Sequence, residues 1–506
     1  MITPTRDEFY KLADKGNLIP VYCDVMADME TPVSAYYKIC NINKSKNKNS
    51  SAISAFLLES IEGGENIARY SFLGINPRSI FIQKDGKAEL ITGSKRESID
   101  GCDIFGRINK LLKKYNPVKI DGLPPFIGGA VGYASYDVIS EIENSVITPE
   151  KTPYDLPEAY FMIADTVLVF DRVKHTIKVL SQVFLDCNEN IDEEYDNALE
   201  QINKIVKLLQ TPITIPPVIK DNNNANKLTS SSNKTEEEFR AMVARTKQYI
   251  YDGDIIQAVI SQRFSIDIDI SPIALYRALR MINPSPYMFL LNCGDFSVVG
   301  ASPEIHAKCI DRKITVRPIA GTRKRGNSQS DDLLLEEELI NDPKERAEHL
   351  MLVDLARNDV GRIAKTGTVK VKNLMVIEKY SHVMHIVSTV NGILDDEFDS
   401  DSVMRSTFPA GTLSGAPKVR AMQIISEQEK EKRGPYGGVV AYYSFDGNID
   451  SCITIRTAVI KNNRVYIQAG AGIVADSDPL SEFEETKNKA LALVKAVNLA
   501  KNFDID

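Results

Sequence analysis

The stretch PKERAEHLMLVDLARNDVGR, residues 343–362, carries two glutamates spaced three apart, Glu345 and Glu348, in a segment whose composition favours a helix. Residues three apart on a helix project from the same face. A second pair with this spacing, Glu482 and Glu485, lies in another helical segment near the carboxyl end. If the two helices meet, four carboxylates converge, and because they repel each other they need a cation. An all-oxygen cluster suits Mg²⁺ and an anionic ligand. Taken alone, either pair is more simply explained as the solvated face of a helix.

Residues 210–234 form the clearest break in the chain. They combine prolines with a run rich in Asn, Ser and Lys, which cannot bury a core, and this composition is typical of a linker. A capping box of Thr235 and Glu238 starts a helix directly afterwards. We therefore expect a first domain over residues 1–209, a linker over 210–234 and a second domain over 235–506.

The order of the expected elements predicts an α+β fold in which sheets are faced by helices. Strand patterns dominate before the linker, and strands and helices alternate without a regular βαβ rhythm after it. No internal repeat is evident. Strands are expected at residues 55–60, 69–74, 79–83, 88–92, 166–171, 176–184, 255–270, 287–293, 296–301, 383–393, 439–445, 451–460 and 464–469. Helices are expected at residues 272–282, 343–357, 417–432 and 479–500.

The composition excludes several classes of protein. The net charge of −8 and the pI near 5.5 argue against a nucleic-acid surface. Seven cysteines without a CxxC motif are typical of buried thiols in a reducing compartment. No run of about 18 apolar residues occurs, and the amino terminus lacks an apolar leader. We expect a soluble cytoplasmic protein without a membrane partner.

Three glycine-containing segments offer backbone N–H groups to an anion: PIAGTR at 318–323, PAGTLSGAPK at 409–418 and QAGAGIVAD at 468–476. We expect the first two to form loops and the third to end a strand. None of them is a P-loop, and each alone is compatible with an ordinary turn.

Two residues carry suggestive chemistry within apolar strands. Arg456 lies in the middle of CITIRTAVI, where it either forms a salt bridge with a core acid or clamps a carboxylate. His385 lies in HVMHIVS, where a histidine is more often a satisfied core residue than a catalytic one.

These motifs together resemble the chorismate-utilising enzymes, and most closely the large subunits of anthranilate synthases. The likeness spans residue 235 to the end of the chain and includes GPYGG at 434–438 and EFEETKNKA at 482–490. In the first part, LLES at 57–60 and RYSFLG at 69–74 resemble the regulatory region of that subunit. The resemblance implies a two-lobed anthranilate synthase-like fold with β-sheets sandwiched between helices. It also implies a regulatory lobe before the linker and a chorismate-binding catalytic domain after it.

The resemblance further implies a role for each matching residue. Glu348 and Glu485 would ligate Mg²⁺, the one cofactor implied, with Glu345 and Glu482 in the cluster through water. Glu304 would protonate the departing C4 hydroxyl, and His385 would assist the later elimination of pyruvate. The remaining residues of the pocket are Gln257, Thr412, Tyr436, Arg456, Gly470, Ala471, Gly472, Lys489, Ala320, Gly321 and Thr322.

Two positions discriminate between branches of the family. The relatives that add water, isochorismate and salicylate synthases, carry a lysine base where this chain has Gln257, and an amide cannot accept a proton at neutral pH. Aminodeoxychorismate synthases typically carry a nucleophilic lysine where this chain has Ala320. Ammonia is therefore expected to add at C2 and form aminodeoxyisochorismate, which then loses pyruvate to give anthranilate, in the first committed step of tryptophan biosynthesis.

Alternatives remain open at this level. Aminodeoxychorismate synthase is the second choice, followed by isochorismate or salicylate synthase, and a regulatory subunit without activity belongs to a different class. The chain has no cysteine in a glycine-flanked nucleophile elbow, so ammonia must come from a separate glutamine amidotransferase subunit. The expected assembly is a heterotetramer.

A feedback site for tryptophan is also implied, and the plain alternative is lobe packing. An apolar slot would take the indole, and Glu59, Ser60 and backbone carbonyls would take the ammonium. The residues that match this site are Leu58, Glu59, Ser60, Asn283, Pro286, Tyr287, Met288, Val440, Tyr442 and Cys452.

Overall fold

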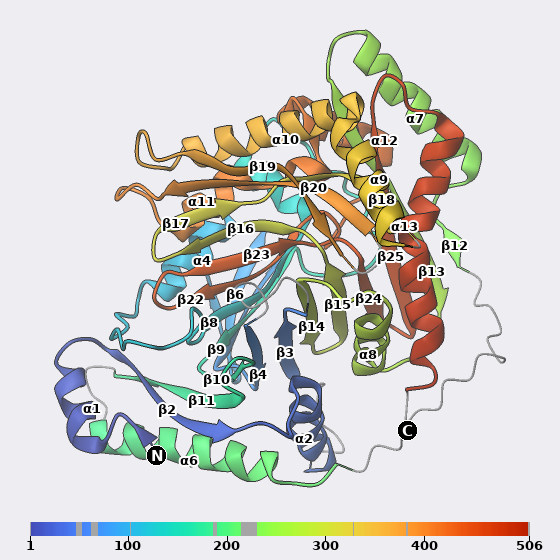
Figure 1. Ribbon diagram of the computed structural model, residues 1–506. Helices are drawn as coiled ribbons and strands as arrows, with labels where there is room; N and C mark the ends of the chain where they lie inside the picture. The colour runs from blue at the N-terminus through green and yellow to red at the C-terminus, as the bar shows by residue number, and fades with distance from the viewer. Residues whose placement is uncertain are drawn as a thin grey trace.

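The computed structural model describes residues 2–46, 53–61, 69–101, 103–185, 190–213, 230–326, 328–380 and 383–503. Two large antiparallel sheets face each other, and helices cover their outer faces (Figure 1). The predicted α+β class, with sheets between helices, is confirmed.

The first sheet contains strands from both ends of the chain. Its order is β1 (Ile2–Thr3), β2 (Leu18–Met26), β11 (Thr176–Phe184), β10 (Thr166–Asp171), β4 (Tyr70–Ile75), β3 (Ser54–Glu59), β14 (Tyr287–Cys293), β15 (Phe296–Ser302), β24 (Thr457–Lys461), β25 (Arg464–Ile473), β13 (Gln257–Asp267) and β12 (Ser231–Ser232). The short strand β21 (Gly415–Ala416) also pairs with β13.

The second sheet is built in the same way. Its order is β18 (Ile319–Lys324), β20 (Val383–Ile393), β17 (Lys313–Val316), β16 (Ile305–Ile310), β23 (Ile449–Ile453), β22 (Val439–Ser444), β8 (Gly129–Ala134), β9 (Ala159–Ala164), β5 (Ser79–Lys84), β6 (Lys87–Thr92) and β7 (Lys95–Ser98). The strand β19 (Lys370–Lys379), which sequence reasoning missed, pairs with β20.

Apolar clusters fill three layers. One lies between the sheets and includes Phe56, Phe289 and Tyr442. The helices packed on the first sheet are α1 (Arg6–Ala13), α2 (Pro32–Lys46), α6 (Ile191–Leu209), α7 (Glu236–Tyr251), α8 (Pro272–Ile282), α12 (Lys418–Glu429) and α13 (Pro479–Ala500). Those packed on the second sheet are α4 (Ile104–Leu112), α5 (Ile139–Ile142), α9 (Gln329–Asn341), α10 (Pro343–Gly361) and α11 (Ser400–Thr407).

The strand order repeats on either side of the contact between β3 and β14. Outward from this contact, the first sheet runs β3, β4, β10, β11, β2 on one side and β14, β15, β24, β25, β13 on the other. The second sheet repeats likewise on either side of β8 and β22. The two parts of the sequence therefore have similar topologies, although no sequence repeat is evident. Because both sheets cross from one part to the other, the boundary at 210–234 does not separate the sheets.

The chain passes from one sheet to the other at four short connections. Two of them matter for the site: β15 leads through Glu304 into β16, and β23 leads through Arg456 into β24. These connections lie side by side, since Ile453 N–H donates to Glu304 O at 3.1 Å and Ala301 N–H donates to Arg456 O at 3.1 Å.

This arrangement corrects the expectation of one strand over residues 451–460. Arg456 has a φ of 50° and separates two strands that belong to different sheets. The continuous apolar run concealed the break because both strands are buried.

Two other expected elements differ from the structure. The segment 318–323, expected as a loop, lies in strand β18 except for Pro318. The pairing of β18 with β20 shifts register between Ala320 and Thr322. The helix expected to reach residue 432 ends at Glu429, because Lys430 adopts a left-handed conformation with a φ of 59°.

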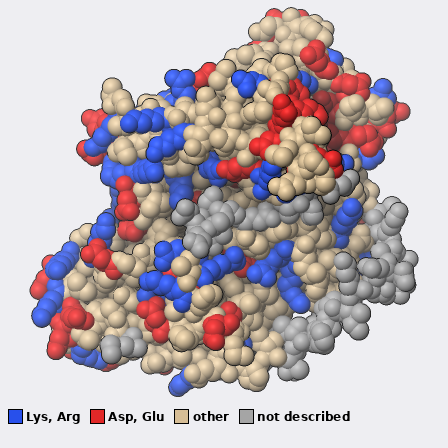
Figure 2. Space-filling view, viewed as in Figure 1, with Lys and Arg blue, Asp and Glu red and all other residues tan. Residues whose placement is uncertain are grey.

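The molecular surface carries both signs of charge. On the face in Figure 2, Lys and Arg form several separate groups, and Asp and Glu gather at the upper right, where Figure 1 places α9 and α13. No helix within the described ranges combines the length and apolar character needed to cross a membrane.

Candidate active site

Glu304 is a buried carboxyl at the connection between the two sheets. Its side chain accepts a 2.8 Å hydrogen bond from the hydroxyl of Thr412, in the short 3-10 helix η2 (Gly411–Leu413). Burial raises the pKa of Glu304 to about 7, although the Thr412 hydroxyl and the charge of Lys489 act in the opposite direction. Near neutral pH this carboxyl is therefore suited to deliver a proton.

Gln257 stands at the start of β13 and faces the first glutamate pair. Its Nε2 donates to Oε1 of Glu348 at 3.2 Å. On the adjacent strand, a Cβ at Gly472 would lie 2.6 Å from the Gln257 amide nitrogen, so only glycine leaves room for this side chain.

Tyr436, Arg456, Gly470 and Lys489 lie together. Lys489 Nζ donates to Gly470 O at 3.0 Å, and Arg456 donates to Lys489 O at 3.1 Å. A Cβ at Gly470 would lie 2.6 Å from the hydroxyl oxygen of Tyr436. Ala471 is buried on the same strand, opposite Ile260.

His385 is held by the irregular strand pair of β18 and β20. Its Nδ1 lies 3.0 Å from Gly321 O and 3.1 Å from the hydroxyl of Thr322. Burial lowers the pKa of His385, and the charge of Arg456 lowers it further. The imidazole is thus neutral near pH 7. With Nδ1 donating to Gly321 O, Nε2 is left as an acceptor. Ala320, opposite Ile386, carries no nucleophile.

The two glutamate pairs face each other but do not form a closed cluster. Burial raises the pKa of both Glu348 and Glu482, and the second glutamate of each pair raises it further. The charge of Lys489 from α13 acts on Glu348, and that of Lys344 from α10 acts on Glu482. The two helices are therefore close enough for their charges to interact.

Basic side chains bind the other two glutamates. Arg323 donates to Glu345 at 3.0 Å, and Lys489 pairs with Glu485 at 2.6 Å. Among the described residues, no three His, Cys, Asp or Glu side chains gather closely enough to hold a metal ion. The predicted convergence of four carboxylates is thus not assembled in this structure. Sequence reasoning missed Arg323 and Lys344, which lie within or directly beside motifs it had identified.

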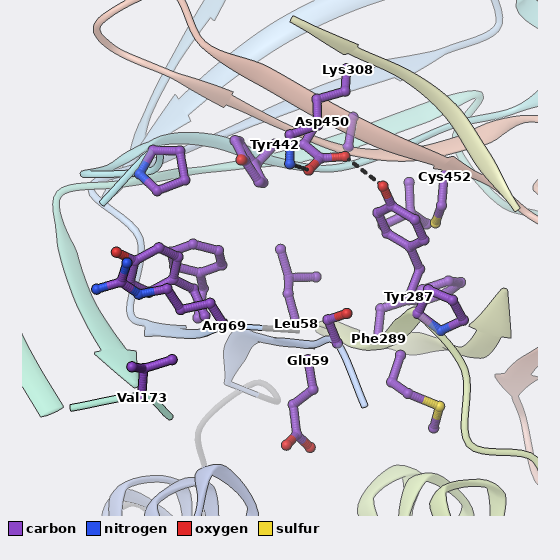
Figure 3. A pocket seen from close by; sticks show the side chains of 18 residues that line it. Leu58, Glu59, Arg69, Val173, Tyr287, Phe289, Lys308, Tyr442, Asp450 and Cys452 are labelled. Carbon is purple, nitrogen blue, oxygen red and sulfur yellow. Dashed lines mark hydrogen bonds and ion pairs between the residues drawn. The ribbon is translucent and has the colours of Figure 1, made fainter. Parts of the chain in front are cut away.

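A second site lies between the sheets, separate from these residues. It is a cavity of 430 Å³ with β3, β4 and β14 on one wall and β16, β22 and β23 on the other (Figure 3). Of the residues predicted for tryptophan, those that line it are Leu58, Glu59, Ser60, Pro286, Tyr287, Met288, Val440, Tyr442 and Cys452. Asn283 is not among them: it ends α8, and its amide contacts Ser285 and Ala301 O at 3.4 and 3.5 Å.

The carboxylate of Glu59 does not serve the cavity as expected. Figure 3 shows it directed away, toward the helices, where it accepts from the hydroxyl of Tyr276 at 2.6 Å. Arg280 and Arg172 lie 3.3 and 3.4 Å from it. The reason is electrostatic, because a buried carboxylate needs these cationic partners. Among the residues that the structure describes, none forms a hydrogen bond with the buried hydroxyl oxygen of Ser60.

The cavity holds a polar group that sequence reasoning missed. Asp450 accepts a 2.9 Å hydrogen bond from Tyr287 and pairs with Lys308 at 3.0 Å. Figure 3 shows Asp450 and Lys308 on the upper wall, and Tyr287 reaching Asp450 from the opposite wall. Asp450 and Lys308 are cross-strand partners on β23 and β16. No motif marks them, and only the strand register brings them together.

Comparisons with known proteins agree along almost the whole chain. The sequence profile described as chorismate binding enzyme matches residues 54–495. Anthranilate synthase component 1 of Acetivibrio thermocellus is 47% identical over 513 residues, which cover 99% of this chain and 99% of that protein. The protein of that name from Synechocystis sp. is 46% identical, with 98% of this chain and 99% of its own length covered.

Solved structures give the same result for the fold. Anthranilate synthase component I from Streptococcus pneumoniae TIGR4 superposes with a TM-score of 0.76 at 34% identity, over 93% of this chain and 99% of that chain. The menaquinone-specific isochorismate synthase of Escherichia coli superposes with a TM-score of 0.69, over 97% of this chain and 98% of that chain. At 15% identity, the second likeness concerns the fold alone.

The raised pKa of Glu304 has a consequence for stability. In the folded protein this pKa is about 7, against an ordinary 4.5, so between these values the folded state binds more protons than the unfolded state. Stability is therefore lost as the pH rises through this window. Glu304→Gln removes this loss, and from pH 5 to pH 8 the variant should gain about 2–3 kcal/mol relative to wild type. Denaturant unfolding of both proteins at the two pH values measures the difference. An offset that does not change with pH would show that Glu304 titrates normally.

Proposed function

Since the chain belongs to the chorismate-binding enzyme family, we propose that it is the large subunit of an anthranilate synthase. Ammonia adds at C2 of chorismate with loss of the C4 hydroxyl, and pyruvate then leaves to give anthranilate. The observation that carries this choice within the family is the pair Gln257 and Ala320, supported by full-length relatives named anthranilate synthase component 1.

Gln257 and Ala320 remove the nucleophiles that two sister reactions need. A water-adding relative requires a base, but the Gln257 amide donates to Glu348 and has no proton acceptor of useful basicity. Ala320 excludes the covalent lysine route. Free ammonia needs neither group, because neutral ammonia is a much stronger nucleophile than neutral water.

Glu304 supplies the proton for the first step. The departing C4 hydroxyl leaves as water only if it is protonated, and a carboxyl with a pKa of about 7 still holds a proton near neutral pH. The hydrogen bond from Thr412 fixes the position of the carboxyl. Lys489, whose charge acts on Glu304, offsets the negative charge that remains after proton transfer.

His385 acts in the second step. Elimination of pyruvate requires removal of the proton at C2, and a neutral imidazole with a free Nε2 is a suitable base. Gly321 O, 3.0 Å from Nδ1, keeps the ring in the orientation that leaves Nε2 free. Arg456 and Tyr436 hold the enolpyruvyl carboxylate together with the N–H groups of Gly470 and Gly472.

The glutamate pairs fit Mg²⁺ by their chemistry. All four donors are carboxylates, which this ion prefers. Burial and the like charge of the neighbouring glutamate raise the pKa of Glu348 and of Glu482. A bound cation would stabilise the ionised form of both carboxylates. Glu348 and Glu485 would hold the ion, with Glu345 and Glu482 through water, once Lys489 and Arg323 release Glu485 and Glu345. When bound, Mg²⁺ would neutralise these charges and hold the ring carboxylate of chorismate.

A separate glutaminase subunit would supply ammonia in a heterotetramer. The relatives are named as component 1, a name that presupposes a second component. The sequence contains no amidotransferase nucleophile elbow, which agrees with a division of labour between two chains.

The cavity between the sheets would bind tryptophan as a feedback inhibitor. Phe72, Tyr442 and Met288 offer an apolar wall to an indole, and Ser60 and Asp450 offer acceptors to its ammonium. Two strands that line the cavity lead directly to active-site residues, because Tyr436 precedes β22 and Arg456 follows β23. Residues 1–209 then contribute one wall of the regulatory cavity, and residues 235–506 contribute the catalytic groups.

The nucleophile assignment is tested with the purified chain, chorismate, Mg²⁺ and ammonium salts. Anthranilate fluorescence should appear and increase with pH as free ammonia increases, and glutamine should serve only after the glutaminase subunit is added. The glutamine reaction without the partner is the control. Isochorismate or aminodeoxychorismate as the main product would overturn the assignment.

Loss of a metal ligand should abolish turnover without unfolding the protein. Glu348→Gln and Glu485→Gln should each lower kcat/KM by at least about 10²-fold, because even supporting groups of metal sites cost 10–100-fold. Glu484→Gln is the matched control, since Glu484 is exposed on the same helix and pairs with Lys487. Undiminished activity in EDTA would contradict a role for Mg²⁺.

His385→Ala should separate the two chemical steps. Amination depends on Glu304, so the variant should still consume chorismate while aminodeoxyisochorismate accumulates. Chromatography of the reaction mixture detects this intermediate. If chorismate consumption stops altogether and no intermediate is seen, the imidazole is required for the first step as well.

Tryptophan and chorismate should weaken each other's binding by about 5–150-fold, which is the usual range of such coupling. Ser60→Phe fills the cavity, and Met288→Thr removes part of its apolar wall, so both should relieve inhibition while ammonia-dependent turnover remains. Met281→Thr, an exposed methionine on α8, is the control. Calorimetry that detects no tryptophan binding to the wild-type chain would dismiss this site.

A further inference from the structure

Arg433 is a fully buried cation outside the set of predicted site residues. Only 1% of it is exposed, and its guanidinium forms a bidentate pair with Glu429 at 2.8 and 2.6 Å. Burial alone would lower the pKa of Arg433, but Glu429 raises it above its ordinary value. Glu429 also accepts from the backbone N–H and the hydroxyl of Ser261, both at 2.8 Å. The pair is therefore charged and closely hydrogen-bonded.

The remaining donors of Arg433 reach two segments of the active site. Nη1 donates to Leu413 O at 2.8 Å, and Leu413 directly follows Thr412. Nη2 donates to Val259 O at 2.6 Å, two residues after Gln257 on β13. One planar group thus joins the segment that holds Glu304 in place to the strand that begins with Gln257.

The guanidinium of Arg433 lies over the rings of two tyrosines. Its central carbon lies 5.6 Å from the ring centre of Tyr436 and 4.4 Å from that of Tyr136. Both distances fall within the range of cation–π attraction. Tyr436, proposed to hold the substrate carboxylate, is thereby fixed relative to Leu413 and Val259.

The first part of the chain contributes to the same arrangement. Asp137, in the 3-10 helix η1 (Tyr136–Val138), accepts from the backbone N–H groups of Arg433 and Gly434 at 3.2 and 2.7 Å. Tyr136 N–H donates to Gly434 O at 3.0 Å. These bonds fix the backbone of Arg433 and Gly434, which precede Pro435 and Tyr436.

We propose that Arg433 is a positioning residue that sets the relative placement of Thr412, Gln257 and Tyr436 around the substrate. This inference rests on the proposed function and adds a residue to its machinery. A guanidinium is required because a lysine has no planar fork and cannot reach two carbonyls and one carboxylate at the same time. The first consequence is kinetic, since small misplacement of catalytic groups reduces turnover on the order of 10²-fold.

A second consequence concerns the pH profile. The Thr412 hydroxyl lowers the pKa of Glu304, so a displaced Thr412 leaves the pKa of this carboxyl higher. At a fixed concentration of free ammonia, activity declines as Glu304 loses its proton. In an Arg433 variant this decline should occur at higher pH than in wild type. A merely structural role would not shift it.

The test compares Arg433→Lys and the double variant Arg433→Met with Glu429→Met, using ammonia-dependent anthranilate formation. The double variant removes both buried charges together, which proteins often tolerate better than the loss of one partner. The matched control is the same double change at Arg263 and Glu431. These two residues form an ion pair at 2.6 Å, and their side chains are 10% and 12% exposed. Circular dichroism and thermal melting establish which variants are folded.

The folded Arg433 variants should lose kcat/KM by about 10- to 100-fold, with a higher KM for chorismate and the shifted pH profile, whereas the control pair should keep all three parameters. Wild-type kinetics in either folded variant would overturn the proposal. So would failure of both variants to fold, because it would assign Arg433 to the stability of the fold. If the wild-type chain makes no anthranilate, the proposed function fails instead.

Discussion

The arrangement of the candidate active site depends on two adjacent connections between the sheets. Where β15 ends, Glu304 leaves the first sheet, and where β23 ends, Arg456 leaves the second. A residue at such a connection is buried between layers, and its side chain is not confined to one face of a sheet. The two connections are bonded to each other through Ile453 N–H and Ala301 N–H. A buried acid and a partly buried cation are thus held at a fixed separation.

Burial at this point determines the chemistry. Glu304 keeps a proton near neutral pH because desolvation outweighs the Thr412 hydrogen bond and the Lys489 charge. His385 becomes a neutral imidazole for the same reason, since burial disfavours its charged form. One physical effect therefore prepares both the acid and the base that the proposed reaction requires. In the Arg433–Glu429 pair the outcome is the opposite, because the hydrogen bonds between the two side chains outweigh desolvation and keep both groups charged inside the protein.

Local signals predicted much of the fold. The strands 166–171, 176–184 and 287–293 and the helices 272–282 and 479–500 end where expected, because turns, caps and prolines mark them. The sequence did not reveal the repeated topology, which lies in strand order and not in residue identity. It also concealed the break at Arg456 inside an apolar run. For the site, motifs identified Glu304 and Lys489, whose charge acts on that carboxyl. The orientation of Glu59 and the pairing of Asp450 with Lys308 depend on partners distant in sequence.

The central claim is that burial keeps the carboxyl of Glu304 protonated near neutral pH. The most direct measurement is the infrared difference spectrum between wild type and Glu304→Gln, recorded from pH 5 to pH 9. The account predicts a protonated carboxyl band that disappears with a midpoint of about 7. A band that has already disappeared near the ordinary value of 4.5 would contradict it.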